Sequence, residues 1–324
     1  MKNLIKIIRM NNNKKFFQRF CKDYNLPINV FEDSMFWYYK ELYKDFFPER
    51  EFKSAIAMIE DKFNGNVDLW LDYCAKVRDT AINSILESEA YQKFNTIDLN
   101  EYKVSGFKER STYTEETDGK CFISIDLKKA NFQALKWMNV IEDYSYDHFI
   151  RRMGGDDYIA GSKYLRQVIF GKCNPSRQIT IEKHLMSLIE DAIKNKMKNY
   201  GFELYSFNSD DLIYEEVDYK AVYDTPIKKF LEEVKMMIEK YLNIEVSVEY
   251  FSVERVPVVN PNGSKVDAYI KRNLITREVK YKKISTTFFP QVYKLIKGMD
   301  ITEMDRVFFF ENQLATFNES LKIE

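Results

Sequence analysis

Two stretches of the sequence decide the fold: residues 120–126, KCFISID, and residues 202–217, FELYSFNSDDLIYEEV. The first is a short apolar run with β-branched residues that follows the turn-like Thr117-Asp118-Gly119. It predicts a buried strand that ends in an acid, Asp126. The second places aromatic and aliphatic runs on both sides of a short polar centre, which predicts a β-hairpin with Asp210 and Asp211 at its tip.

Helical patterns surround these strands. Apolar residues recur at helical spacing in 127–140 and in the long segment 176–199, which Gly201 is suited to end. A further helix, Thr225–Leu242, precedes the alternating strand pattern of 244–251. The order strand, helix, helix, hairpin, helix, strand predicts an α+β fold with a mostly antiparallel sheet and helices on one face.

The N-terminal third is expected to be helical. Residues 14–95 carry aromatic and aliphatic side chains at three- and four-residue spacings, with breaks at 25–27, Pro48 and 64–66. We expect these aromatic residues to form a core. No apolar run is long enough for a membrane span, and the four cysteines never form a CxxC pair. These features predict a soluble, cytoplasmic protein with reduced thiols and no membrane contact.

The acids Asp126, Asp210 and Asp211 are the first candidate site. Carboxylates at close range repel each other unless a cation neutralises them. Oxygen ligands without a nearby histidine favour Mg²⁺ or Mn²⁺, and two such ions about 4 Å apart can drive an in-line phosphoryl displacement. The alternative interpretation of Asp210-Asp211 is a simple polar turn.

The surrounding residues resemble the motifs of right-hand (palm) nucleic-acid polymerases. The segment FISIDLKKANFQAL (122–135) resembles motif A, and SFNSDDLIYEEV (206–217) resembles motif C of reverse transcriptases and family B DNA polymerases. Between them, YLRQVIFGKCNPSRQITIEKHLM (164–186) is similar to motif B in position and chemistry. DAYIKR (267–272) looks like the Lys-Tyr motif of family B, with Tyr before Lys. The resemblance covers about residues 118–275 and is typical of a phage or mobile-element polymerase.

This resemblance implies template-directed nucleotidyl transfer from nucleoside triphosphates by two Mg²⁺ or Mn²⁺ ions, without a proofreading exonuclease domain. Asp126 and Asp210 would be the principal metal ligands, with Asp211 as the second acid of motif C. Backbone amides at the start of the following helix would hold the triphosphate, and Asn131, or Phe132 in a shifted register, would contact the sugar. The implied nucleotide-binding residues are Leu127, Lys128, Lys129, Ala130, Asn131, Phe132, Arg166, Lys172 and Arg177.

A basic segment follows these motifs. Between Arg255 and Lys297 there are ten Lys or Arg and two acids, whereas the whole chain has a net charge of −1. A cationic surface of this kind favours contact with a nucleic-acid backbone, although a solvated charged face is the alternative. Six residues are expected to bind a primer-template duplex: Lys271, Arg272, Arg277, Lys280, Lys282 and Lys283.

These patterns predict three regions. The first is a helical N-terminal region, residues 1–117. The second is an antiparallel-sheet palm, residues 118–254, which contains a short fingers insertion at about 140–175. The third is a small basic thumb-like region, residues 255–324. Two other functions stay open. One keeps the metals without the template, as in a terminal transferase or a two-metal nuclease. The other is a non-enzymatic nucleic-acid-binding replication accessory protein.

Overall fold

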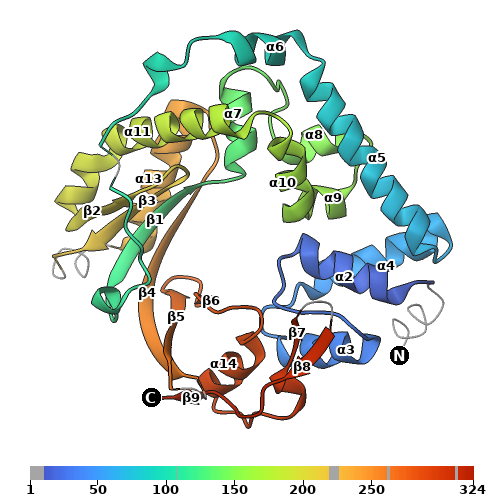
Figure 1. Ribbon diagram of the computed structural model, residues 1–324. Helices are drawn as coiled ribbons and strands as arrows, with labels where there is room; N and C mark the ends of the chain where they lie inside the picture. The colour runs from blue at the N-terminus through green and yellow to red at the C-terminus, as the bar shows by residue number, and fades with distance from the viewer. Residues whose placement is uncertain (1–10, 107, 219–225, 261–262, 311–312) are drawn as a thin grey trace. The chain divides into compact units, whose positions relative to one another are not determined.

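The computed structural model describes residues 11–106, 108–218, 226–260, 263–310 and 313–324. The chain divides into two compact units, and neither is continuous in sequence (Figure 1). The first consists of Met1–Gln92, Glu142–Cys173 and Glu303–Phe317. The second consists of Lys93–Ile141, Asn174–Thr302 and Asn318–Glu324. The segment expected to be a fingers insertion therefore falls mostly in the same unit as the N-terminal helices.

The first unit is largely helical, as the sequence predicts. Its core is built from aromatic residues at helical spacing: Phe16, Phe17, Phe36 and Trp70 are fully buried, and the rings of Phe17 and Phe36 stack with centroids 4.0 Å apart. The elements are α2 (Asn13–Asp23), α3 (Asp33–Leu42), α4 (Glu49–Phe63), α5 (Val67–Leu86), α8 (Tyr146–Arg152), α9 (Asp157–Gly161), α10 (Lys163–Gly171), η3 (Met304–Arg306), β7 (Val307–Phe310) and β8 (Gln313–Thr316). Helix α6 (Glu89–Thr96) crosses into the second unit.

The second unit contains a seven-stranded sheet with the order β2-β3-β1-β4-β5-β6 and β9 paired to β4. All pairings are antiparallel. The chain order β1, helix, β2, β3, helix, β4 gives the split β-α-β arrangement. The strands are β1 (Cys121–Leu127), β2 (Phe202–Phe207), β3 (Asp211–Glu216), β4 (Val246–Val259), β5 (Lys265–Asn273), β6 (Val279–Lys282) and β9 (Lys322–Ile323).

The helices of this unit match the predicted order. They are α7 (Ala130–Trp137), α11 (Pro175–Asn199), α13 (Ile227–Leu242) and α14 (Phe289–Ile296), with short η1 (Asn100–Tyr102) and η2 (Glu115–Thr117). Gly201 follows the end of α11 with φ 83°, the left-handed conformation that favours glycine at this position. The predicted helix start at Thr225 lies outside the described residues. The α+β class, the helical N-terminal region and the antiparallel sheet are thus confirmed.

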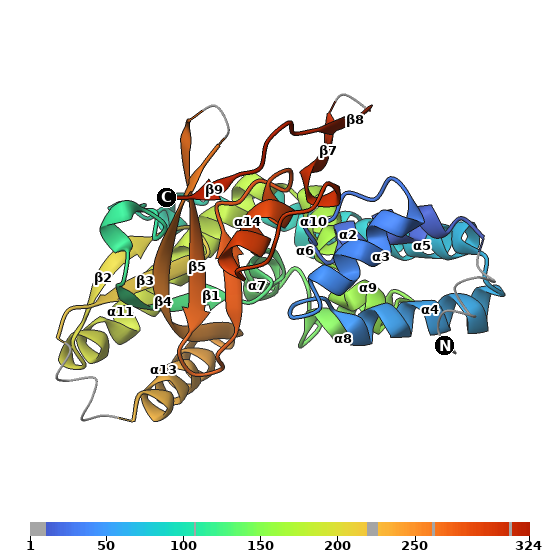
Figure 2. The same cartoon turned by 90° about the horizontal axis from the view of Figure 1, so that it is seen from below.

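Helices α11 and α13 cover one face of the sheet, and Asp126 and its strand partner Asp211 lie on the other. Helix α13 contacts β4, and α11 contacts β2 and β3 (Figures 1 and 2). Side chains alternate between faces along a strand, so Ile123, Ile125 and Leu127 face the helices and are buried. Asp126 points to the opposite face. On that face, Phe122 packs with Ile213, Phe251, Val253 and Tyr269.

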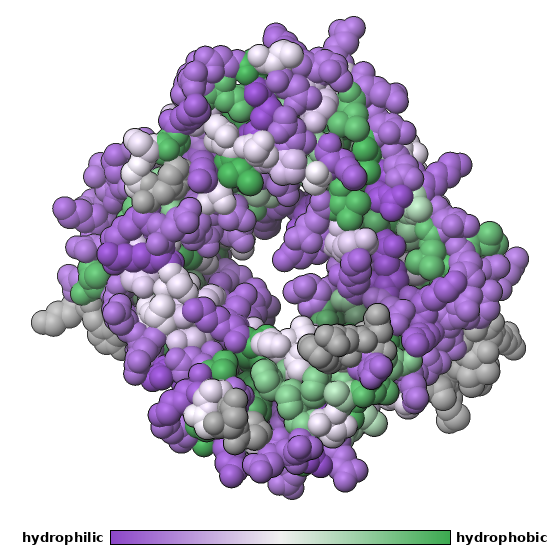
Figure 3. Space-filling view, viewed as in Figure 1, coloured by the Kyte–Doolittle hydropathy of each residue, from purple (hydrophilic) through white to green (hydrophobic). Residues whose placement is uncertain are grey.

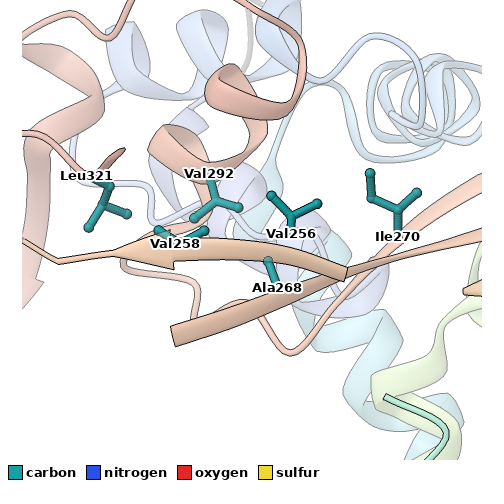
Figure 4. Packing of buried hydrophobic residues seen from close by; sticks show 6 residues of the cluster. All are labelled: Val256, Val258, Ala268, Ile270, Val292 and Leu321. Atoms are coloured by element: carbon teal, nitrogen blue, oxygen red, sulfur yellow. The ribbon is translucent and has the colours of Figure 1, made fainter. Parts of the chain in front are cut away.

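The second half of β4 forms a separate small core with β5 and α14. Val256 and Val258 of β4 pack with Ala268 and Ile270 of β5, Val292 of α14, and Leu321 near the C-terminus (Figure 4). The long strand β4 therefore belongs to both cores. Within the sheet, it lies between β1, which carries Asp126, and β5 and β6, which carry most of the predicted cations.

Hydrophilic residues predominate on the molecular face seen in Figure 3. Within the part of the chain that the structure describes, no helix combines the length and the apolar character needed to cross a membrane.

Candidate functional site

Sheet pairing brings together acids that are far apart in sequence. Asp126, near the end of β1, lies directly opposite Asp211, the first residue of β3. The backbone N–H of Leu127 donates to the carbonyl oxygen of Asp210 at 2.9 Å. Hydrogen-bonded and non-hydrogen-bonded pairs alternate in antiparallel sheets, so Asp126 and Asp211 form a non-hydrogen-bonded pair, whose side chains approach more closely. The predicted acidic site is therefore a consequence of the β1–β3 register.

The carboxyl group of Asp126 is strongly perturbed. Its side chain is solvent-exposed, yet the surrounding protein desolvates the carboxyl group and, together with Asp210, Asp211 and Glu249, raises its pKa to about 6. The cationic Lys271 opposes this shift. Carboxylates crowded in this way resist simultaneous ionisation, and a cation would relieve their repulsion.

Asp211 is held in place by its own hairpin. Burial raises the pKa of Asp211, and Asp210 adds to the rise. The Asn208 side-chain amide counteracts this by donating to Asp211 Oδ1 at 2.5 Å. The Asn208 backbone N–H also donates to the Asp211 carbonyl oxygen at 3.0 Å. One oxygen of Asp211 is therefore engaged in the turn, whereas Asp126 and Asp210 are solvent-exposed.

The donor set fits a hard divalent cation. Asp126, Asp210 and Asp211 offer only oxygen ligands, the type that Mg²⁺ and Mn²⁺ prefer. Among the described residues, no three His, Cys, Asp or Glu side chains are arranged to hold a metal ion by themselves. Mg²⁺ is commonly bound by one or two carboxylates together with substrate phosphates and water. Asp126 and Asp210 fit that mode of binding.

Sequence reasoning missed Glu182, a buried acid on α11. Only 4% of Glu182 is exposed, and its Oε1 accepts a hydrogen bond from the Asn131 side-chain amide at 2.8 Å. Burial and the nearby Asp210 raise the pKa of Glu182 to about 7, and the bond from Asn131 opposes the rise. Glu182 thus joins the predicted sugar-contacting residue to the acidic site. Phe132 is only 1% exposed and belongs to the core.

A signal for Glu182 was present in the sequence. Helix α11 buries Gln178, Ile181, Leu185 and Ile189 along one face, and Glu182 lies within that row. Acids are almost never fully buried without a partner. An acid within the apolar row of a helix that resembles motif B therefore indicates a functional or structural hydrogen bond.

Glu249 was also missed, and it changes how two predicted cations are interpreted. Glu249 lies on β4 and forms ion pairs with Lys271 at 2.6 Å and with Lys280 at 3.3 Å. Burial raises the pKa of Glu249, but the two lysines outweigh it, so the pKa lies below its usual value. The Lys271 ammonium also lies 4.0 Å from the ring centroid of Phe251. Lys271 is therefore held inside the site.

The start of α7 offers fewer amides than expected for a triphosphate. The N–H of Leu127 donates to Asp210, and that of Lys128 donates to the carbonyl oxygen of Glu245 at 3.0 Å. These two amides stabilise the sheet and are not available as phosphate donors, which corrects the prediction for them. Lys129 adopts a left-handed conformation, φ 55°, and α7 begins at Ala130. The amides at the first turn of α7 stay candidates.

The three predicted phosphate-binding cations do not form one cluster in the second unit. Arg166 lies on α10 and Lys172 at its end, and both belong to the first unit. Arg177 belongs to the second unit, where its guanidinium donates to the Ile97 carbonyl oxygen at 2.6 Å. It also lies 5.3 Å from the ring centroid of Phe94. These contacts give Arg177 a structural role in anchoring the segment before β1.

The remaining basic residues divide between the two faces of the sheet and its turns. Lys282 pairs with Tyr269 across β5 and β6, on the face that carries the acids. The Lys283 ammonium lies 5.8 Å from the ring centroid of Tyr269. Because neighbouring side chains alternate, Arg272 lies on the opposite face. Arg277 is exposed in the turn before β6. Lys282 and Lys283 are therefore the best-placed cations for a polyanion on the acidic face.

Comparison with protein-family models found no match, and comparison with curated proteins found none either. The assignment of function therefore depends on the residues of the site and on their geometry.

We predict that Asp126→Asn stabilises the metal-free protein at neutral pH. The native pKa of Asp126, about 6, exceeds the ordinary 3.8, so the folded protein keeps a proton that the unfolded chain releases. The free energy of unfolding contributed by this group falls as pH rises from about 4 to about 6. Because Asp126 is solvent-exposed, screening reduces the effect, and we expect a gain of about 1 kcal/mol at pH 7.

Urea unfolding in EDTA across this pH range measures the effect. The matched control is Asp191→Asn, which removes an exposed acid on α11 that is paired with Lys194. The control should keep the wild-type pH dependence. A less stable Asp126→Asn protein at pH 7 would contradict the electrostatic description of the site.

Proposed function

We propose that this protein is a template-directed nucleotidyltransferase that extends a nucleic-acid primer from nucleoside triphosphates. One observation carries the proposal: Asp126 and Asp211 are paired on the sheet face opposite α11 and α13, and Asp210, at the hairpin tip, lies close enough to raise the pKa of Asp126. The motif resemblance predicts this arrangement from residues that are distant in sequence. The palm interpretation applies to the second unit, in which β1 and α7 carry the segment that resembles motif A and α11 carries the second part of the segment that resembles motif B. The first part of that segment lies on α10 of the first unit.

Each acid has a distinct role in this proposal. Asp126 and Asp210 would hold two divalent cations, and Asp211, fixed by Asn208, would position the hairpin tip. When bound, such ions activate a 3′-hydroxyl group and stabilise the leaving pyrophosphate. Lys271 pairs with Glu249 and also opposes the rise in the Asp126 pKa, so it offsets negative charge before substrate binds. The rigid β1–β3 pairing would keep the reacting groups aligned.

Asn131 is the proposed contact for the sugar. Its side-chain amide is held by Glu182, which leaves the amide oxygen as an acceptor for a sugar hydroxyl. Asparagine is smaller than the aromatic residues that the resemblance implies at this position. The buried Phe132 is poorly placed to replace it.

We predict that Asp126→Asn and Asp210→Asn each abolish primer extension while the protein stays folded. Removal of one carboxylate removes a ligand that the second one cannot replace. Primer extension with Mg²⁺ on matched and mismatched templates measures this, and Asp191→Asn serves as the control with wild-type activity.

The same assay separates the alternatives. Extension that ignores the template sequence would indicate a terminal transferase, and primer shortening would indicate a nuclease. Nucleic-acid binding without metal-dependent chemistry, unchanged in Asp126→Asn, would favour an accessory protein and refute the proposal.

We predict that Lys282→Glu combined with Lys283→Glu weakens binding to duplexes of unrelated sequence about equally. Backbone contacts carry no sequence information. Each lost lysine contact should reduce the slope of the logarithm of the binding constant against the logarithm of the salt concentration by about one. Duplex titrations at several salt concentrations measure this. The matched control is Lys228→Glu with Lys229→Glu, on the α13 side of the sheet. An equal loss in the control, or a sequence-selective loss, would refute a backbone-binding role.

We predict that the wild-type protein excludes ribonucleotides only weakly. A hydrogen bond from a 2′-hydroxyl to Asn131 contributes about 0.5–1.5 kcal/mol, or roughly threefold to tenfold in preference. Asn131→Tyr should therefore shift incorporation toward deoxynucleotides. Single-turnover incorporation of matched dNTP and NTP pairs measures the ratio. A wild-type preference for dNTPs above about a thousandfold, far beyond one hydrogen bond, would show that another bulky group excludes the hydroxyl.

A further inference from the structure

The first unit contains a cavity that belongs to none of the motifs described above. It has a volume of about 670 Å³ and lies between α2 and the segment that follows it, up to residue 31. Lys14, Gln18 and Lys22 of α2 line one side, at intervals of four residues that place them on one face of the helix. Asn25 and Asn29, in the segment after α2, also line it. This volume is within the range of cavities that bind small molecules or single residues of a polymer.

The cavity has an uncompensated positive charge. None of its lining residues is acidic. The other cations of α2 have acid partners: Lys15 pairs with Asp68 at 2.7 Å, and Arg19 with the buried Asp23 at 2.9 Å. Lys14 and Lys22 form no ion pair of this kind with any residue that the structure describes. The contrast within a single helix indicates that these two lysines are available to an external anion.

Lys22 is also held in position. Its ammonium lies 3.9 Å from the ring centroid of Tyr164 on α10, which belongs to the same unit. A cation–π contact orients an ammonium group without neutralising its charge. The two lysines are eight residues apart on α2, or about 12 Å along the helix axis. This spacing suits two separate phosphates better than a single one.

The rest of the lining suits a nucleobase. The Gln18 amide donates to the Val30 carbonyl oxygen at 3.0 Å, which fixes the side chain and leaves its own carbonyl oxygen as an acceptor. Asn25 and Asn29 are exposed and supply further donors and acceptors. Ile28 and Val30 are buried and provide the apolar part of the lining. One fixed amide, two exposed amides, an apolar surface and two cations match the polar edge, flat ring and phosphates of nucleotides.

We propose that the cavity beside α2 binds a segment of single-stranded nucleic acid, with two non-adjacent phosphates of the strand at Lys14 and Lys22 and a base against the amide side chains. It would give the first unit a nucleic-acid contact of its own, separate from the acids of the second unit. The contact reads phosphates and ring faces, so it should be salt-sensitive and only weakly sequence-selective.

Fluorescence anisotropy with a short labelled single-stranded oligonucleotide tests the proposal. The protein carries Asp126→Asn and the buffer contains EDTA, so metal-dependent binding at the acidic site does not contribute. Lys14→Gln with Lys22→Gln should weaken binding about tenfold or more. The matched control is Lys15→Gln with Lys53→Gln, two exposed lysines of the same unit outside the cavity. It should bind nearly as well as the parent.

A second variant separates the cavity from a simple charged surface. Asn29→Trp fills the cavity at an exposed position without changing the charge, and it should also weaken binding. A parallel titration with a nucleoside triphosphate distinguishes a strand from a free nucleotide. Tight binding of the triphosphate alone, equal losses in both lysine pairs, or normal binding by Asn29→Trp would each overturn the proposal. Because all arms omit the metal, failure here leaves the proposed catalytic function untouched.

Discussion

The antiparallel register between β1 and β3 is the constraint on which the acidic site depends. Ile125 and Leu127 are buried on the helix-covered face, while Asp126 between them faces away. A slip of one residue would reverse every side chain of β1. It would expose isoleucine and leucine, at about 1.5–3 kcal/mol for each side chain, and would place a carboxylate beneath α11 and α13. The hydrophobic pattern that folds the sheet therefore also fixes where the acids lie.

Local patterns were sufficient to predict the acids but not the groups that balance them. Asp126 ends a strand pattern and Asp210-Asp211 occupies a hairpin tip, and both features are visible within a few residues of sequence. Lys271 lies in a strand that no local pattern pairs with β4, so its contact with Glu249 depends on a register that only the folded sheet defines. Charge counting therefore identified Lys271 as a cation but could not show that it is paired with Glu249.

The composition of the first unit also depends on contacts between distant segments, which local sequence patterns do not predict. Helical periodicity predicted α2 to α6, but nothing local predicts that residues 142–173 and 303–317 join them in one unit. Buried polar contacts make that connection: Asp23 accepts hydrogen bonds from Tyr158 and Ser162, both at 2.7 Å, and Tyr38 donates to the buried Asp305 at 2.8 Å. A buried carboxylate is costly without such partners. These pairs therefore favour one specific arrangement of distant segments, which composition and periodicity do not encode.

The acidic site is a balance of unfavourable and compensating charges. Burial and mutual repulsion raise the pKa values of Asp126, Asp211 and Glu182, and each rise is opposed by a named neighbour: Lys271 for the two aspartates, Asn208 for Asp211, and Asn131 for Glu182. These neighbours do not cancel the effect of burial and repulsion, because the pKa values of all three acids still lie above their usual values. Residual electrostatic strain of this kind is common where a protein prepares a site for a ligand that is absent from the free protein.

The long strand β4 connects the acids to the lysines, since it pairs with β1 beside the acids and with β5 beside the lysines. A polyanion that drew Lys271 or Lys280 away from Glu249 would therefore alter the charge around Asp126. In the proposed function, substrate binding at the basic strands and cation binding at the acids would therefore be electrostatically coupled through one sheet.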